Sequence, residues 1–317
     1  MNRLLKDLKS VGWRRCFLLL RVALTLIILA VVVLRVDVGR IGSAFQSVRA
    51  SSSILALLLA PLNLSVQMYR WHFIVKTADS VAPPKDVLRS VLTGLGFSLA
   101  TPGRIGEVGR ALYVPSSNPV RIVGLVILEK VFAFIAILIA SAVSIMLWGG
   151  LAAGALLIVC ALLSAFRLSS IRALLSRLTF LLPFGQRVAD LWSAWDRFGR
   201  KQIASLLAIS MGFFAIVFLQ FYALVSSFQA VKLLPALISI PLTMAVNCLP
   251  ITVAGLGLRE GAAVFFFSKF GVSEAAALNG AFLLFIIDIL IPGLIGLPLI
   301  SKMRLKFEHL DEERSHR

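Results

Sequence analysis

Long apolar runs, separated by short polar segments, restrict the fold of this chain more than any other feature. They lie at 17–36, 52–71, 121–148, 151–166, 203–228 and 275–300. Each run is near or above the roughly 18 to 20 residues that a helix needs to span hydrocarbon. Only 15% of the 317 residues are charged, against about 25% in soluble domains. The chain is therefore predicted to be an all-α polytopic membrane protein with about six full spans.

The net charge of +17 is distributed as a topology signal. Lys and Arg gather at the ends of apolar runs, which is typical of the positive-inside rule. A nucleic-acid-binding protein would carry them on one patch, so we expect no nucleic-acid partner. The basic start at 1–16 precedes a long run without a cleavage site, which favours an uncleaved anchor. Both termini are predicted to be cytoplasmic.

The runs divide the chain into two membrane halves. The predicted regions are a basic cytoplasmic N-terminus at 1–16, a first half at 17–166, a basic amphipathic cytoplasmic segment at 167–201, a second half at 202–301 and a charged cytoplasmic tail at 302–317. The middle segment has apolar residues at helical spacing. It is expected to form two short helices on the membrane surface, or else an ordinary basic loop.

Within the run at 52–71, Pro61 and Asn63 are expected to interrupt the helix near its middle. Tyr69 and Trp71 stand near its end, where aromatic residues favour the membrane interface.

The stretch SLATPGRIGEVGRALYV at 98–114 places charge, proline and glycine beside an apolar run. Helices over 87–100 and 104–114 would measure about 21 Å and about 17 Å at 1.5 Å per residue, so neither spans the roughly 30 Å core. A single crossing here would also put 167–201 outside, against the charge bias. The sequence therefore predicts a re-entrant hairpin at 87–114.

The tip of this hairpin has residues suited to a helix start at depth. Its structural residues are Pro102, Gly103 and Gly106, and Thr101 is placed to cap the second helix. Spacings of three put a set of charges on one helical face: Arg104, Glu107 and Arg110. The positive end of the helix dipole favours an anion at such a tip.

A second stretch of this kind is NCLPITVAGLGLREGAAVFFF at 247–267. Its tip residues are Pro250, Gly255 and Gly257, and its charges are Arg259 and Glu260. We expect a second re-entrant hairpin at 235–270, entering from the opposite side. Two broken elements of opposite direction predict an inverted repeat with a binding site at the membrane midplane.

Further ionisable residues lie inside spans: Glu129, Lys130 and Asp288. Such residues usually face a partner or a cavity. The expected resting pairs are Arg104 with Glu129, Glu107 with Lys130, and Arg259 with Asp288. These residues either bind substrate or hold the fold together, and the sequence leaves both interpretations open.

The sequence contains no motif that indicates a metal site or a cofactor site. The three Cys and three His residues show no CxxC or HExxH spacing, and the glycines of the two stretches do not follow β-strands of a nucleotide-binding fold. We therefore expect no metal and no cofactor.

The stretches TPGRIGEVGRALYV, VILEKVFAF and LPITVAGLGLREGAAVFFFSKFGVSEAAALNGAFLL resemble the lysylphosphatidylglycerol synthase transmembrane, or flippase-like, family of bacterial and archaeal membrane proteins. The resemblance covers about 22–302 and rests on the patterns P-x-R-x-G-E and G-x-G-x-R-E. Some members are fused to an aminoacyl transferase, for which no room is expected after 302. Lys130 stands where the family often has arginine, which keeps the charge and loses the bidentate fork.

The resemblance implies a lipid flippase of the bacterial cytoplasmic membrane, and not an enzyme. Its substrate-binding residues would be Arg104, Glu107, Arg110, Glu129, Lys130, Arg259 and Glu260. The expected partners are membrane lipids and a lipid-synthesising enzyme. Three alternatives remain. One is a small-solute secondary transporter, and another is a non-transporting accessory protein that holds lipid or a synthase partner. The third is an intramembrane enzyme using Glu107 and Glu260 as acid and base, although no nucleophile accompanies them.

Overall fold

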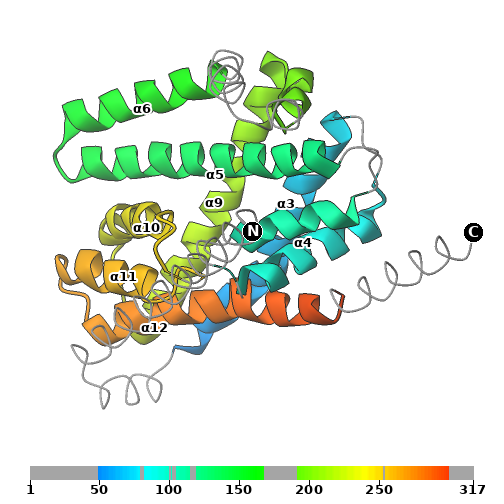
Figure 1. The fold of residues 1–317 in the computed structure, drawn as a ribbon. Coiled ribbons are helices and arrows are strands. Elements are labelled where there is room, and N and C mark those ends of the chain that lie inside the picture. The colour runs from blue at the N-terminus through cyan, green and yellow to red at the C-terminus, as the bar shows by residue number, and fades with distance from the viewer. Residues whose placement is uncertain are drawn as a thin grey trace, which may run out of the picture.

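A computed structural model of the protein describes residues 49–78, 82–99, 101, 105–114, 119–167, 191–252 and 254–299. All regular elements in these residues are helices, and none is a strand (Figure 1). Several predicted features lie outside them: the N-terminus at 1–16, the run at 17–36, most of 167–201, the tail at 302–317, and the tip residues Pro102, Gly103 and Arg104.

The helices repeat one order of lengths. The first half contains α3 (Ala50–Thr77), α4 (Pro84–Leu99), the 3₁₀ helix η1 (Ile105–Tyr113), α5 (Pro119–Leu147) and α6 (Leu151–Phe166). The second contains η2 (Ala194–Arg197), α9 (Arg200–Phe228), α10 (Leu233–Asn247), α11 (Leu258–Ser268), α12 (Glu274–Phe285) and the π-helix η3 (Ile286–Leu290), after which the helix continues over 291–299. In both halves a long helix is followed by two short helices and another long one.

Four helices within the described ranges are long and apolar enough to cross a membrane. They are Ala50–Thr77, Val120–Leu147, Arg200–Phe228 and Glu274–Leu299. The run predicted at 151–166 forms α6, whose 16 residues extend about 24 Å and fall short of a full span. It lies along α5 (Figure 1), and leucines such as Leu151 and Leu156 are exposed, as expected for a helix that faces lipid.

The chain around the first predicted hairpin forms two short helices packed side by side. α4 and η1 run antiparallel, since Gly94 lies beside Glu107 and Gly106 lies beside Phe97. A Cβ built on Gly106 would collide with the carbonyl oxygen of Phe97, so glycine is required for this close approach. The hydroxyl of Thr101 accepts a hydrogen bond from the Gly106 N–H at 2.7 Å. Thr101 therefore caps the second helix as expected, although that helix begins at Ile105 and is 3₁₀.

α3 differs from the sequence expectation at two places. Pro61 does not interrupt it, because the helix continues through this residue from Ala50 to Thr77. Trp71 is not exposed as an interfacial aromatic residue would be: its side chain is fully buried within the protein, and its indole N–H donates to the Ser90 hydroxyl at 3.0 Å. A hydrogen-bond partner inside the protein explains how the indole can be buried.

α10 contains Pro241, which lacks an N–H for the carbonyl four residues before it. That carbonyl belongs to Leu237, and it accepts a hydrogen bond from the Ser144 hydroxyl of α5 at 2.7 Å. The adjacent Ser141 hydroxyl donates to the Pro241 carbonyl at 3.1 Å. Neighbouring helices satisfy freed backbone groups in this way within apolar surroundings.

Two apolar cores lie side by side. One packs α4 against α3, α5 and the start of α9, and the other packs α9 against α10, α11 and α12. α3 and α9 run antiparallel between them, as the backbone bond from Arg49 N to Ser227 O at 2.8 Å indicates. The described end of the basic segment packs on the first core, where the buried Trp195 indole donates to Gly124 O at 2.9 Å. This end therefore contacts α5.

Candidate functional site

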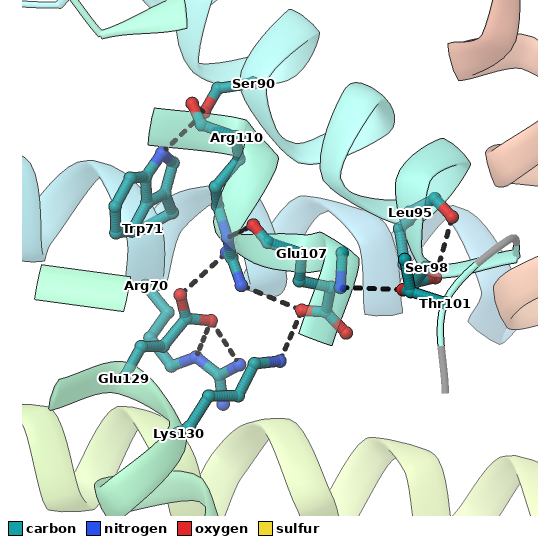
Figure 2. A network of polar contacts seen from close by, with 11 residues as sticks. Arg70, Trp71, Ser90, Leu95, Ser98, Thr101, Glu107, Arg110, Glu129 and Lys130 are labelled. Carbon is teal, nitrogen blue, oxygen red and sulfur yellow. Dashed lines mark hydrogen bonds and ion pairs between the residues drawn. The ribbon is translucent and has the colours of Figure 1, made fainter. Parts of the chain in front are cut away.

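Five charged side chains from α3, η1 and α5 meet in one network, the charge cluster (Figure 2). They are Arg70, Glu107, Arg110, Glu129 and Lys130. The charges alternate in sign from Arg70 through Glu129, Arg110 and Glu107 to Lys130. Residues distant in sequence are thus joined into one chain of ion pairs.

Glu129 lies at the centre and binds one arginine with each oxygen. Arg70 Nη2 and Nε lie 2.6 and 3.1 Å from its Oε1. Arg110 Nη1 lies 2.7 Å from its Oε2. A single carboxylate therefore connects α3 and η1 to α5. Its removal would take an ion-pair partner from two buried guanidinium groups at once.

Glu107 joins the other end of the network. Its carboxylate lies 2.8 Å from Arg110 Nη2 and pairs with Lys130 Nζ, and its backbone carbonyl accepts from Arg110 Nε at 3.2 Å. Glu107 and Arg110 can meet in this way because side chains three apart eclipse one another on a 3₁₀ helix.

Aromatic rings support both arginines. The Arg110 guanidinium lies 4.9 Å from the ring centre of Trp71, and that of Arg70 lies 4.5 Å from Phe213 of α9. Such cation–π contacts stabilise a desolvated cation by about 2 kcal/mol. Ser90 of α4 fixes the arrangement further, since its hydroxyl donates to the Arg110 carbonyl at 2.8 Å.

The cluster is buried except at one member. The side chains of Arg70, Glu107, Arg110 and Glu129 are 2% exposed or less, whereas that of Lys130 is 41% exposed. Among the described residues, its three cations and two anions leave a formal charge of +1. Ionisable groups within apolar spans are costly and usually mark a substrate path or hold one another, and the surplus positive charge favours an anionic ligand.

The second predicted hairpin also forms two short helices, α10 and α11. Arg259 and Glu260 occupy the first turn of α11, with Arg259 Nη2 at 2.6 Å from Glu260 Oε1. The other Glu260 oxygen accepts the Gly257 N–H at 2.7 Å, so this carboxylate caps its own helix. Arg259 lies 5.6 Å from the Phe285 ring centre, and both charged side chains are buried.

The tip of this second pair owes its shape to backbone conformation. Ala254, Gly255 and Gly257 all have positive φ, of 52°, 77° and 81°, which glycine adopts without strain. Ala254 packs in a small apolar cluster with Phe285 and Ile289, and Leu99 at the end of α4 packs against the same cluster. The second tip and the last residue of α4 therefore pack in the same small apolar cluster.

Asp288 lies in the π-helix four residues before Pro292, whose missing N–H disturbs regular α-helical bonding there. Its carboxylate accepts hydrogen bonds from Asn63 Nδ2 at 2.8 Å and from Gln220 Nε2 at 2.9 Å. Asn63 Nδ2 also donates to Gln220 Oε1 at 3.2 Å. Asp288 thus joins α3, α9 and the last helix through two carboxamides.

Among the expected pairs, that of Glu107 with Lys130 is present. Arg259 pairs with Glu260, and Asp288 with carboxamides, so the expected pair of Arg259 with Asp288 is wrong. Glu260 follows Arg259 directly in α11, so its carboxylate binds the guanidinium without a partner from another helix. Arg104 lies outside the described residues, and the partners described for Glu129 are Arg70 and Arg110. The structure brings Glu107, Arg110, Glu129 and Lys130 together, and it places Arg259 and Glu260 in a separate pair.

Sequence reasoning missed three polar residues: Arg70, Asn63 as a partner of Asp288, and Gln220. Arg70 stands at the end of the predicted run and therefore resembles an interfacial anchor. The sequence does contain a signal for Arg70, because an acid such as Glu129 inside a span needs a nearby cation. In the structure Arg70 lies inside α3 and supplies that cation.

Comparisons with known proteins identify the family of the chain. A comparison with curated proteins found no match. A family model described as the lysylphosphatidylglycerol synthase TM region matches residues 18–296, a range that includes both pairs of short helices and every charged residue of the two sites. The chain therefore belongs to the family of lysylphosphatidylglycerol synthase transmembrane regions.

Proposed function

We propose that this protein moves lipids between the two leaflets of a membrane by holding an anionic headgroup at the charge cluster. The family consists of membrane domains linked to lipid-related flippase or synthase function, and the described part of the chain has four helices long and apolar enough to cross a membrane. The observation that carries the proposal is the largely buried charge cluster, whose described members are three cations and two anions from three helices. No covalent step belongs to the proposal.

A headgroup phosphate would reach the cluster through Lys130. Lys130 is the member whose side chain is substantially exposed, and its ammonium pairs with Glu107, which also binds Arg110. A phosphate can take the place of the Glu107 carboxylate at both cations, because guanidinium and ammonium groups bind phosphate oxygens with charge-assisted hydrogen bonds. Lys130 acts as a point charge there, while the planar fork of Arg110 gives direction.

The second pair of short helices provides a related arrangement. In it Glu260 binds Arg259 and the Gly257 N–H, so its carboxylate occupies the position an anion would take at a helix N-terminus. The repeated order of long and short helices supports an inverted repeat with two re-entrant hairpins, with the two charged sites near the midplane.

The orientation that follows from charge bias places both termini and the basic segment on the cytoplasmic side of a bacterial inner membrane. Thiol labelling tests this. Gly185→Cys, in a chain whose Cys16, Cys160 and Cys248 are replaced by alanine, should react with a membrane-impermeant reagent from the cytoplasmic side. Labelling from the outside in intact cells would contradict this orientation and the first re-entrant hairpin with it.

A vesicle assay tests the lipid movement itself. Purified protein is reconstituted in vesicles that contain acyl-labelled phosphatidylglycerol, and dithionite quenching reports how fast label leaves the inner leaflet. Glu107→Gln should retain the fold and reduce the rate at least tenfold. The Glu107 carboxylate is the anion that exchanges with the phosphate at Arg110 and Lys130, and the neutral glutamine cannot take its place when the lipid leaves.

The matched control lies on α4. Arg89 pairs with Asp86 at 3.3 Å on the surface, with 43% of the Arg89 side chain exposed, so Arg89→Ala changes a cation without touching the cluster and should keep the wild-type rate. Wild-type protein that moves no labelled lipid, or Glu107→Gln protein that moves lipid normally, would overturn the proposal. A new covalent lipid product in the same vesicles would favour an enzyme.

A further inference from the structure

The buried face of α3 changes from apolar to polar at the middle of the helix. Its buried residues are Ala56, Leu59, Asn63, Gln67, Arg70, Trp71, Ile74 and Val75. Asn63, Gln67 and Arg70 follow one another at spacings of four and three, which places them on one side of the helix. They form a polar strip about 10 Å long at 1.5 Å per residue, with apolar residues before and after it.

Both ends of the polar strip reach groups described above. Arg70 belongs to the charge cluster and lies over Phe213 of α9. Asn63 donates to Gln220 of α9 and to Asp288. Since Phe213 and Gln220 are also seven residues apart, the polar strip follows the contact between α3 and α9 from the charge cluster to Asp288.

The middle of the polar strip has unused hydrogen-bonding groups. Gln67 is 7% exposed, and within the described residues its carboxamide makes no hydrogen bond. One turn away, the Nη1 of Arg70 is a fully buried donor without an acceptor in that same part of the chain, and it points away from Glu129 (Figure 2). An unsatisfied buried polar group costs about 1–3 kcal/mol, and lipid tails offer it no partner. This buried donor, one turn from a carboxamide whose hydrogen-bonding groups are unused, points to a ligand.

We propose that the polar strip binds the uncharged, hydroxyl-bearing part of a lipid headgroup while its phosphate occupies the charge cluster. A carboxamide both donates and accepts, as a hydroxyl does, so Gln67 suits a polyol or sugar group. The guanidinium Nη1 of Arg70 supplies a further donor to such a group. The inference rests on the proposed function and adds the substrate class, namely phosphodiester lipids with a hydroxylated headgroup.

Two lipids separate this idea from phosphate binding alone. Phosphatidylglycerol and phosphatidylpropanol carry the same charge and the same three-carbon group, and they differ by two hydroxyls. In the vesicle assay, wild-type protein should move phosphatidylglycerol about three- to tenfold faster, the ratio expected from one neutral hydrogen bond of roughly 1 kcal/mol. Gln67→Leu should remove this preference and leave the phosphatidylpropanol rate unchanged.

Two measurements guard against a purely structural effect. Because Gln67 makes no hydrogen bond, Gln67→Leu should unfold no more easily than the wild type on heating in detergent, and Gln67→Met provides a second apolar variant. Gln202→Leu makes the same change near the start of α9, where the glutamine is half-buried, and it should keep the preference for hydroxyls.

The outcomes are distinct. Equal wild-type rates for the two lipids, a preference retained in both Gln67 variants, or marked destabilisation of both variants would each overturn the inference while leaving the proposed function in place. A wild-type protein that moves neither lipid would instead overturn the proposed function.

Discussion

The two pairs of short helices hold their charges in different ways. In the first, Glu129 of α5 binds Arg70 of α3 and Arg110 of η1, so the ion pairs join three helices. In the second, Arg259 binds its sequence neighbour Glu260, and Glu260 caps the same helix. The ion pairs of the first pair, α4 and η1, therefore fix its position relative to the rest of the bundle. Those of the second pair, α10 and α11, stabilise only the first turn of α11.

The difference extends to the glycines. Gly106 allows η1 to approach the backbone of α4, where a Cβ would collide with a carbonyl. Gly255 instead adopts a φ of 77° beside the Asn247 side chain, which can move. The first pair is thus held by contacts between elements and the second by the conformation of its loop. Substitutions in the first should disturb the bundle, and substitutions in the second should act locally.

The largest expected effect is that of Glu129→Gln. It leaves the buried guanidinium groups of Arg70 and Arg110 without their shared carboxylate, and breaking a buried ion pair costs about 3–5 kcal/mol. The free energy of unfolding in mixed micelles, measured by sodium dodecyl sulfate titration, should fall by about that amount. A loss no greater than that of Glu260→Gln would show that the pairs between helices do not hold the bundle.

Gly106→Ala should come next. Its Cβ must separate η1 from α4 or shift the backbone at Phe97, and overpacking of this kind costs about 1–3 kcal/mol. In Gly255→Ala the new Cβ faces the Asn247 side chain, which can move, and alanine is strained at this positive φ. The expected loss of unfolding free energy is about 1 kcal/mol. The same titration compares the two variants. If Gly255→Ala is the more damaging, the proposed difference between the two pairs is reversed.

Glu260→Gln should cost less, about 1–2 kcal/mol. The amide oxygen still accepts the Gly257 N–H, and what is lost is the charge opposite Arg259 and its charge-assisted hydrogen bond. Hydrogen exchange should show the loss concentrated in the first turn of α11. Faster exchange across α3 and α5 would mean that this pair, too, supports the whole bundle.

Lys130→Met should change stability least, by within about 0.5 kcal/mol, because the Lys130 side chain is 41% exposed and the buried Glu107 keeps Arg110 as its partner. Lipid movement should nevertheless fall at least tenfold in the vesicle assay, since the first cation that a phosphate meets is gone. A variant with unchanged transport would remove Lys130 from the proposed path and leave the structural comparison standing.

The sequence predicted both pairs of short helices because their apolar lengths are too small for a span and their glycines are concentrated. It also predicted that Glu107 pairs with Lys130, since two opposite charges at neighbouring depth need one another. It could not predict that Arg259 would bind its own neighbour, because that choice depends on side-chain direction in the first turn of α11. The 3₁₀ form of η1 likewise depends on how closely it packs on α4.

Polar residues within spans were the hardest to interpret. Asn63 and Gln220 are separated by 157 positions, and their contact depends on how α3 and α9 align. A single sequence gives the polarity of each helix and not this alignment. Arg70 shows the same limit: its position near the end of an apolar run suggested an anchor, whereas α3 continues to Thr77 and buries it.

The π-helix at Ile286–Leu290 sets the rotational phase of everything after it. Bonding to the fifth residue instead of the fourth accommodates one extra residue in a turn, which corresponds to a rotation of about 100° in an α-helix. In the observed phase Gly296 lies against the Leu92 carbonyl of α4, and the Tyr113 hydroxyl donates to the carbonyl of Leu299. Deleting one residue here would therefore turn Gly296 away from α4 while changing no side chain that contacts it.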